Sequence, residues 1–394
     1  MKSSYSSFDQ ITNRFGTNSD KWDIMAQQFG QNQIALSVAD MDLLTPEAIQ
    51  KSIRRMADHG IYGYTNLFAP YYDAVKRWMR SAYSWQIEQE WIVFCPRIVQ
   101  AVSLIIQHFT EETDRVLIHT PCYQPIPRSV RLNHRTLVES PLQLINGRYE
   151  MDFDDMERHM QEGIKILLFI SPHNPTGRVW TRPELERVAA LCEKYDVLIV
   201  SDEIHADFAH VGHEHTVIAT LSDAIAQRSI ICTSPAKTFN LAGLEISNII
   251  IPNAELRAGF RTRMLQSGVF DPTFFAVPAL EAAYTACDEW LGELRTYIQG
   301  NIAFAKQFIT EHMPELVVIE PEGTYLLWVD CRAVSRDEQA LKQWIEQEAG
   351  VTVSFGTAFG TGGDGYIRIN LGTPRALLQE ALERIQRAYP LAKR

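Results

Sequence analysis

Three short polar segments carry residue types that commonly do chemistry, and each segment directly follows an apolar run. In chain order they are 171–178 with Asn174, 201–205 with Asp202, and 234–240 with Lys237. Taken singly, each has a plain structural explanation. Asn-Pro and Thr-Gly steps form turns, acids solvate the end of a strand, and a loop lysine usually points into water. The combination of all three is what calls for a chemical interpretation.

The chemistry that these residue types support together is that of pyridoxal 5′-phosphate (PLP). A lysine amine forms a Schiff base with the PLP aldehyde, and an aspartate keeps the pyridine nitrogen protonated, so that the ring withdraws electrons from the substrate. An asparagine donates a hydrogen bond to the phenolate oxygen of the ring. The sequence therefore predicts Lys237, Asp202 and Asn174 in these three roles.

The elements that position these segments follow from hydrophobic patterning. Between residues 95 and 234, short apolar runs alternate with amphipathic segments, as in βα units. Thr181 and Glu184 form a capping box that predicts the start of a surface helix. Such a series predicts a mostly parallel sheet with helices on both faces and ligands at the carboxyl ends of the strands. The predicted buried strands are 116–119, 164–170, 197–200 and 230–233.

Beyond about residue 285 the pattern changes to long amphipathic helices, predicted over 291–309 and 337–349, with a strand over 324–329. A final strand and helix follow, in which Thr373 is expected to cap a helix that Pro374 opens. We therefore expect a large PLP-binding domain over 50–285. A small α/β domain would then be formed by both chain ends, 1–49 and 286–394.

Composition narrows the function classes. The chain has 394 residues, of which 46% are hydrophobic, and a net charge of −11, so we expect no nucleic-acid partner. No apolar run approaches the roughly 20 residues of a membrane span, and residues 1–10 lack a secretory signal, so we expect a cytoplasmic protein. The six cysteines form no Cys-x-x-Cys pair and are expected to be buried, unreactive thiols.

The chain resembles the fold-type I PLP enzymes of aminotransferase class I/II over nearly its whole length. The family's motifs are matched by Asn174 in Asn-Pro-Thr-Gly, Asp202 in Ser-Asp-Glu, Lys237 in Ser-x-x-Lys-Thr-Phe-Asn and Arg368 in Tyr-Ile-Arg-Ile-Asn. These anchors are 28, 35 and 131 residues apart in turn, which also fits the family. The resemblance implies a seven-stranded, mostly parallel sheet, PLP as cofactor, and Arg368 as the residue that binds the substrate carboxylate.

Finer features resemble the cystathionine β-lyase (C–S lyase) branch of this family. They are the runs 21–23 (Lys-Trp-Asp), 38–42 (Val-Ala-Asp-Met-Asp), 61–64 (Ile-Tyr-Gly-Tyr), 202–205 (Asp-Glu-Ile-His) and 239–244 (Phe-Asn-Leu-Ala-Gly-Leu). Many transaminases of the class have a tyrosine where this chain has His205, and a phosphate-binding arginine where it has Glu245. Both differences favour the lyase.

The resemblance implies further site residues. Tyr123 is expected to stack on the pyridine ring, and His205 to lie beside the cofactor. The backbone at Ile98 and Val99, at a helix start, and the Ser234 hydroxyl are expected to bind the phosphate. Asn174 and Ala39 would also contact the substrate. Tyr64 would reach the phosphate from a partner subunit, which implies a homodimer with shared active sites.

Three positions depart from the family pattern. Arg97 stands where a glycine precedes the phosphate helix, and Phe355 stands where a proline is usual. Glu245 would bring a carboxylate near a phosphate dianion, which repels it. Either Arg97 compensates for this charge or Glu245 points elsewhere.

We therefore predict a PLP-dependent C–S β-lyase that cleaves L-cystathionine, or a related cysteine S-conjugate, to a thiol such as homocysteine, pyruvate and ammonia. One alternative is a PLP-dependent aminotransferase. Another, of a different class, is a PLP-binding regulatory protein that acts through a protein partner. A metal centre is not expected, because the spacing of the nearby acids and histidines matches no known metal motif. Those histidines are His205, His210, His213 and His215.

Overall fold

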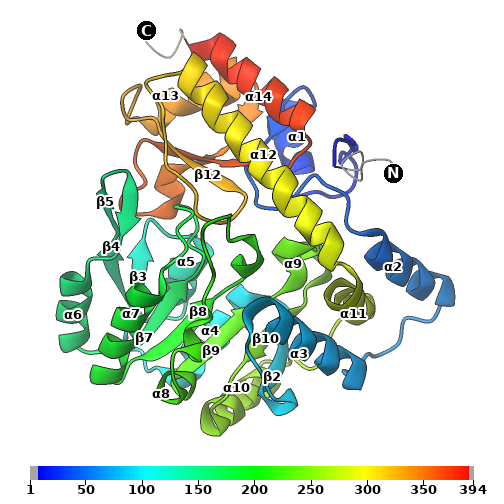
Figure 1. Ribbon diagram of the computed structural model, residues 1–394, viewed down its shortest axis with the longest axis vertical. Helices are drawn as coiled ribbons and strands as arrows, with labels where there is room; N and C mark the ends of the chain where they lie inside the picture. Colours follow the sequence, from blue (N-terminus) through cyan, green and yellow to red (C-terminus); the bar gives the residue numbers. More distant parts are fainter. Residues whose placement is uncertain (1–7, 390–394) are drawn as a thin grey trace.

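Seven strands form the main sheet of the molecule, which is a computed structural model that describes residues 8–389 (Figure 1). Strands β3, β4, β7, β8 and β9 run parallel to one another, and only β10 is antiparallel to both of its neighbours. In spatial order the strands are β2 (Ile92–Cys95), β10 (Ser247–Ile250), β9 (Ser229–Thr233), β8 (Leu198–Asp202), β7 (Ile164–Ile170), β3 (Arg115–Thr120) and β4 (Thr136–Pro141). The predicted fold class is thus confirmed.

The strands are apolar because both faces of the sheet are covered by helices. Alternate residues of each strand face opposite layers: Leu167 and Ile199 belong to one hydrophobic core, and Leu168 and Val200 to the other. The helices of the second core are α4 (Ile98–Phe109), α5 (Pro125–Leu132) and α10 (Ala254–Gln266). The helices of the first core include α3 (Ala69–Tyr83), α6 (Phe153–Gln161), α7 (Arg182–Lys194), α8 (Asp223–Ala226) and α11 (Ala276–Ala286).

A second, antiparallel sheet follows in the C-terminal part of the chain. Its strands, in spatial order, are β11 (Val317–Val318), β12 (Leu326–Asp330), β15 (Tyr366–Asn370) and β14 (Ser354–Phe355). The long helix α12 (Asp288–His312) runs from beside α11 to beside α14 (Arg375–Ala388), as Figure 1 shows. None of the helices within residues 8–389 is both long and apolar enough to cross a membrane.

The N-terminal part of the chain joins this second sheet region. Strand β1 (Ile34–Ala35) pairs in parallel with β13 (Val351–Thr352), and Arg384 of α14 donates to the Asn32 carbonyl at 2.6 Å. This pairing supports the predicted small domain from both chain ends, although the boundaries 1–49, 50–285 and 286–394 stay a prediction. Residues 1–7 and 390–394 lie outside the described residues, and with them most of the N-terminal segment 1–10.

The remaining elements lie outside the two larger sheets. The other helices are α1 (Trp22–Phe29), α2 (Glu47–His59), α9 (Pro235–Thr238) and α13 (Glu338–Lys342), and β5 (Gln143–Ile145) pairs with β6 (Arg148–Glu150). Short 3₁₀ turns span Gln89–Trp91, Ala206–Phe208, Ile218–Thr220, Ala242–Leu244 and Gly356–Phe359. The helix predicted over 337–349 is real but changes to a π-helix at Gln343–Glu348.

The predicted cap of the last helix is wrong. Pro374 has an extended backbone and is itself the N-cap residue, so α14 begins at Arg375. The Arg375 N–H is satisfied by the Tyr297 hydroxyl at 2.7 Å, a donor and acceptor pair that sequence patterning does not reveal. The Thr373 hydroxyl, in turn, is buried without a hydrogen-bond partner among residues 8–389.

The capping box of α7 is present as predicted. The Thr181 hydroxyl accepts from the Glu184 N–H, and the Glu184 carboxylate accepts from the Thr181 N–H at 2.7 Å. We expect Thr181→Ala to destabilise the protein by about 1 kcal/mol, because the first turn of α7 loses its cap. The measurement is the midpoint of unfolding compared with Thr181→Ser, which keeps the hydroxyl. Equal midpoints for the two variants would contradict a role for the cap.

Candidate active site

Lys237 lies in the single turn α9, directly after β9, and points toward the N-terminal part of the chain. Its Nζ donates to the Ala39 carbonyl at 2.6 Å. Removal from water, together with the positive charge of Arg368, lowers the Lys237 pKa to about 8, although Asp40 and Asp202 partly offset this effect. Near neutral pH, a substantial fraction of this amine is therefore unprotonated and nucleophilic.

Asp202 is the last residue of β8 and lies between the ends of two neighbouring strands. The register pairs it with Ile170 of β7 and Cys232 of β9, the strands that lead to Asn174 and Lys237. Burial raises the Asp202 pKa to about 6, while a hydrogen bond from the Ile204 N–H at 3.2 Å and the charge of Lys237 favour the ionised carboxylate. A cation placed against this carboxylate would be strongly held.

Arg368 and Asn174 come together although they are far apart in the sequence. Arg368, buried in β15, donates to Asn174 Oδ1, the Ser37 carbonyl and Ser354 Oγ, each at 3.0 Å. Asn174 therefore accepts with its oxygen, which leaves its amide N–H groups to donate elsewhere. Burial lowers the Arg368 pKa to about 10, and its Nε is buried without a partner among the described residues. An anionic group would complete this site.

His205 and Tyr123 lie near the same charges. The His205 ring is buried edge-on against Tyr325, with 5.8 Å between the ring centroids, and its Nδ1 is unpartnered within the described part of the chain. Burial, together with the charges of Lys237 and Arg368, holds its pKa well below the ordinary value, so the imidazole is neutral. Burial and the Asp202 charge raise the pKa of the partly buried Tyr123, so its phenol stays protonated.

The predicted phosphate residues lie at the start of α4 and beside α9. Ile98 and Val99 form the first turn of α4, which has no side-chain cap within residues 8–389. Backbone N–H groups at such a start, together with the helix dipole, attract anions. The Ser234 hydroxyl caps α9, accepting from the Ala236 N–H at 3.1 Å and donating to the Ile246 carbonyl at 2.7 Å. Its contact with the phosphate stays a prediction.

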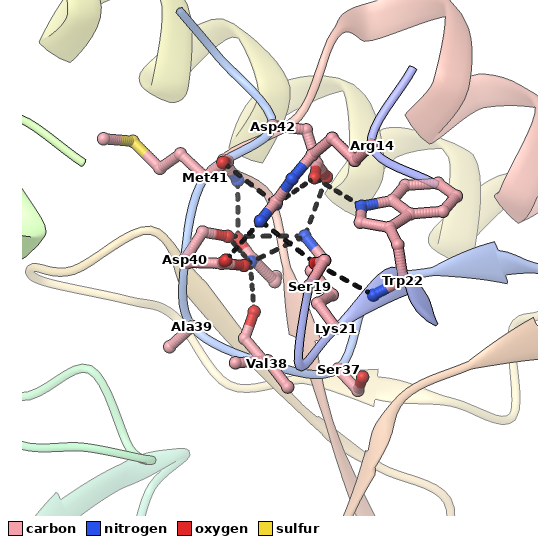
Figure 2. A network of polar contacts seen from close by, with 12 residues as sticks. Arg14, Ser19, Lys21, Trp22, Ser37, Val38, Ala39, Asp40, Met41 and Asp42 are labelled. Carbon is pink, nitrogen blue, oxygen red and sulfur yellow. Dashed lines mark hydrogen bonds and ion pairs between the residues drawn. The ribbon is translucent and has the colours of Figure 1, made fainter. Parts of the chain in front are cut away.

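The segment around Ala39 is held by a buried ionic network (Figure 2). Asp42 accepts from Lys21 at 2.7 Å, Arg14 at 2.8 Å and the Trp22 indole at 2.7 Å. Burial alone would raise the Asp42 pKa, but the positive charge of Lys21 keeps it below the ordinary value. The network fixes the position of residues 38–42, and with them the Ala39 carbonyl that accepts from Lys237.

Three residues that hold this segment have no role in the sequence-based prediction. The Tyr325 hydroxyl donates to the Ala39 carbonyl at 2.9 Å. The Asn240 amide bonds to both the N–H and the carbonyl of Met41, and Asn370 donates to the carbonyls of Val38 and Asp40. Asn240 and Asn370 do stand in the family motifs quoted from the sequence, three residues after Lys237 and two residues after Arg368, but the motifs alone do not show these contacts.

A second polar group holds Thr238, the residue that follows Lys237. Asp207 accepts from the hydroxyls of Thr238, at 2.5 Å, and Tyr83.

The histidines that follow Asp207 in the sequence bind other residues. His215 contacts the Glu203 carboxylate at 2.8 Å, and His210 bonds to the carbonyls of Pro321 and Thr324. Among the described residues, no cluster of three or more acids, histidines or cysteines is arranged to hold a metal ion.

The other residues named in the sequence analysis lie at the surface, in the hydrophobic core or in an ion pair. The Tyr64 side chain is fully exposed on the loop between α2 and α3. Phe355 ends β14 and is buried opposite Ile367. All six cysteines are free and buried, as expected from the sequence. Arg97 and Glu245 form an ion pair with each other.

The residues brought together fit PLP. An amine with a lowered pKa, a carboxylate at the end of a central strand and a buried guanidinium surround one site, where His205 Nδ1 and Arg368 Nε are buried without partners among residues 8–389. The amine matches the aldehyde of PLP, the carboxylate matches the ring nitrogen of PLP, and the guanidinium matches the carboxylate of an amino-acid substrate. The fold and the site together define a fold-type I PLP-dependent enzyme.

Comparisons with known proteins agree. The family model of aminotransferase class I and II matches residues 31–385. The chain is 39% identical to cystathionine β-lyase PatB of Bacillus subtilis, over 97% of this chain and 99% of that protein. Cystalysin from Treponema denticola, whose structure contains PLP, superposes with a TM-score of 0.95 at 35% identity, covering 97% of this chain and 98% of that one. The PLP-bound C–S lyase from Staphylococcus hominis superposes with a TM-score of 0.91 at 33% identity, with 97% of each chain covered.

The chain belongs to the aminotransferase class I and II family, within its cystathionine β-lyase branch. PLP is its cofactor. The resemblance on which the sequence-based prediction depends is thereby confirmed, whereas the roles of the single residues stay predictions supported by the geometry of the site.

The lowered pKa of Lys237 predicts how PLP uptake depends on pH. Only the neutral amine attacks the aldehyde, so uptake by cofactor-free protein should accelerate as pH rises and level off above a pH of about 8. The measurement is the rate of the visible absorbance change after PLP is added at a series of pH values. N-acetyl-lysine, whose ε-amine keeps an ordinary pKa, serves as the control and should continue to accelerate at higher pH. A midpoint shared by the protein and this control would contradict a perturbed Lys237.

Proposed function

We propose that the protein is a carbon–sulfur β-lyase that cleaves L-cystathionine, or a related cysteine S-conjugate, to a thiol such as homocysteine, pyruvate and ammonia. The observation that carries the proposal is the similarity, over 97% of the chain, to a cystathionine β-lyase. The two PLP-containing neighbours, cystalysin and the C–S lyase from Staphylococcus hominis, support the same chemistry.

The geometry supports a role for each central residue. Arg368 would bind the substrate carboxylate with two parallel hydrogen bonds, helped by Asn174, which already contacts it at 3.0 Å. Lys237, whose lowered pKa makes the neutral amine accessible near neutral pH, would remove the proton from the substrate Cα. Bound PLP supplies an acceptor for the electron pair left at Cα.

The bond changes that follow take place on the substrate. The electron pair at Cα expels the thiolate from Cβ, and the remaining three-carbon unit takes up water to give pyruvate and ammonia. His205, expected beside the cofactor, is buried and uncharged, so it adds no positive charge there.

Two other functions are distinguished by one assay. An aminotransferase shares the proton removal but needs a keto acid as acceptor, and a regulatory PLP-binding protein would not turn over the substrate. We expect purified protein to be yellow and to release pyruvate and a free thiol from L-cystathionine without keto acid. An obligatory keto acid would establish the transaminase, and a colourless, inert protein would favour the regulatory function. A panel of cysteine S-conjugates would then define the preferred leaving group.

A homodimer is part of the proposal. The loop between α2 and α3 exposes Ile61, Tyr62, Tyr64 and Phe68, a concentration of apolar side chains that favours burial against another subunit. Tyr64 would thereby reach the phosphate of the neighbouring site. The molar mass in solution tests the dimer directly, and a monomer at micromolar concentration would contradict it. A cytoplasmic location without nucleic-acid partners remains the expectation from the sequence.

A further inference from the structure

Two charged residues at the edge of the site, Arg97 and Glu245, form an ion pair that the proposed function does not use. In the antiparallel pairing of β2 with β10, Cys95 lies opposite Ser247. Continuing this register by two residues brings Arg97 opposite Glu245, immediately before the start of α4. The two residues thus follow and precede the paired ends of β2 and β10, which brings their side chains close enough to form the ion pair.

The pair borders the groups assigned to the phosphate. Arg97 is the N-cap residue of α4, next to Ile98 and Val99. Glu245 is followed by Ile246, whose carbonyl accepts the Ser234 hydroxyl at 2.7 Å. The positive charge of Arg97 also acts on Tyr123, the predicted ring-stacking residue. Arg97 thus lies within electrostatic reach of both the helix start and the ring position.

Stability gives little reason for this pair. The side chains of Arg97 and Glu245 are 65% and 37% exposed, and exposed ion pairs contribute little to folding. Glu245 also has a left-handed backbone, with φ of 55° and ψ of 64°, which glycine or asparagine adopts at lower cost. Strain of this kind at a site is a reason to look for a function of the side chain.

We propose that Arg97, oriented by Glu245, binds the phosphate of PLP at the start of α4, and that the Glu245 carboxylate weakens this binding. The contact with Glu245 uses one end of the guanidinium fork and leaves further N–H donors for an anion. A phosphate oxygen can then lie between Arg97 and the first N–H groups of α4. Glu245 is a positioning residue whose negative charge repels the same phosphate.

This inference rests on the proposed PLP-dependent function and on the predicted position of the phosphate at the start of α4. It goes further by assigning the cationic ligand and an opposing charge, which together set the affinity for the cofactor. A substitution of Glu245 alone would therefore change how tightly PLP is bound, while Lys237 and its contacts stay the same.

Titration of cofactor-free protein with PLP, and in parallel with pyridoxal, tests the proposal. Pyridoxal has the same ring and aldehyde but no phosphate. Arg97→Ala should raise the Kd for PLP about 10- to 100-fold, because a charge-assisted contact is lost, and should change the Kd for pyridoxal less than about 3-fold. Arg97→Lys should recover part of the loss, since it keeps the charge but not the fork.

Glu245→Gln tests the opposing charge, since glutamine still accepts from Arg97 but no longer repels the phosphate. It should lower the Kd for PLP by about 3- to 10-fold at low salt, and less at high salt. In the Arg97→Ala background the same substitution should tighten PLP binding at least as much, because the carboxylate there is unpaired. Arg182→Ala, which removes a comparably exposed ion pair with Glu186 on α7, is the matched control.

The outcomes separate this proposal from the proposed function. An Arg97→Ala variant that binds PLP as wild type does, or that loses PLP and pyridoxal equally, overturns the assignment while leaving lyase activity of the wild type intact. Weaker PLP binding by Glu245→Gln overturns the role of Glu245 as the opposing charge. A wild-type protein that fails to bind PLP at all would overturn both proposals together.

Discussion

Lys237→Ala is expected to lower kcat for thiol release by more than about 10³-fold, because in the proposed mechanism one amine both binds the cofactor and moves the substrate proton. The visible absorbance of the lysine-bound cofactor should disappear with it. The pKa of about 8 is what makes this lysine suited to both tasks, since it exchanges a proton near neutral pH. Activity and spectrum are measured on the same PLP-treated sample.

Two controls separate the loss of chemistry from loss of structure. Lys51→Ala removes an exposed lysine of α2 that pairs with Glu47 on the same helix, and should leave both the spectrum and the rate unchanged. A small primary amine such as ethylamine, added to Lys237→Ala, should restore part of the rate by replacing the missing base. If turnover or the lysine-bound absorbance persisted in Lys237→Ala without added amine, the assignment of this lysine would be wrong.

The parts of the site that could be predicted are those that a local sequence pattern indicates. The ends of β7, β8 and β9 are marked by apolar runs that stop at polar residues, and parallel strands bring their carboxyl ends to one edge. Strand order and polarity alone therefore predict that Asp202 and Lys237 lie near each other. Arg368 depended on family resemblance, since no local pattern distinguishes a buried strand arginine that binds substrate.

The parts that could not be predicted depend on contacts between distant segments. The Lys237 amine reaches the Ala39 carbonyl across 198 residues, and the Lys21 ammonium reaches Asp42 only because α1 packs beside that segment. The runs 21–23 and 38–42 resemble family features, but nothing in their spacing shows that they bond to each other. The predicted cap of α14 is wrong for the same reason, because the Tyr297 hydroxyl comes from α12.

The departures from the family pattern acquire a meaning only in three dimensions. In the sequence, Glu245 is a carboxylate in a place where a phosphate repels it, and two explanations stay open: Arg97 compensates for this charge, or Glu245 points elsewhere. The two side chains form one ion pair beside the ends of β2 and β10, and we expect that pair to affect the affinity for PLP.

Arg368→Gln is expected to lower kcat/KM for L-cystathionine by about 10²- to 10³-fold, because the proposed bidentate contact with the substrate carboxylate would be replaced by a single neutral one. The loss should depend on that carboxylate. An analogue that lacks the carboxylate on the cysteine half of the substrate should bind Arg368→Gln about as well as the wild type. The measurement is therefore a ratio: the wild type should prefer the carboxylate-bearing ligand strongly, and the variant should not.

The physical reason for this ratio is the cost of the buried cation. Arg368 is 4% exposed, and burial already lowers its pKa to about 10, so the folded protein bears part of the desolvation cost before substrate arrives. A bound carboxylate offsets that cost, whereas a neutral ligand cannot. Arg332→Gln, which removes an arginine paired with Asp330 of β12, should leave the ratio unchanged and serves as the control. If Arg368→Gln kept the wild-type preference for the carboxylate, another residue would have to bind it, and the site would need to be reassigned around that residue.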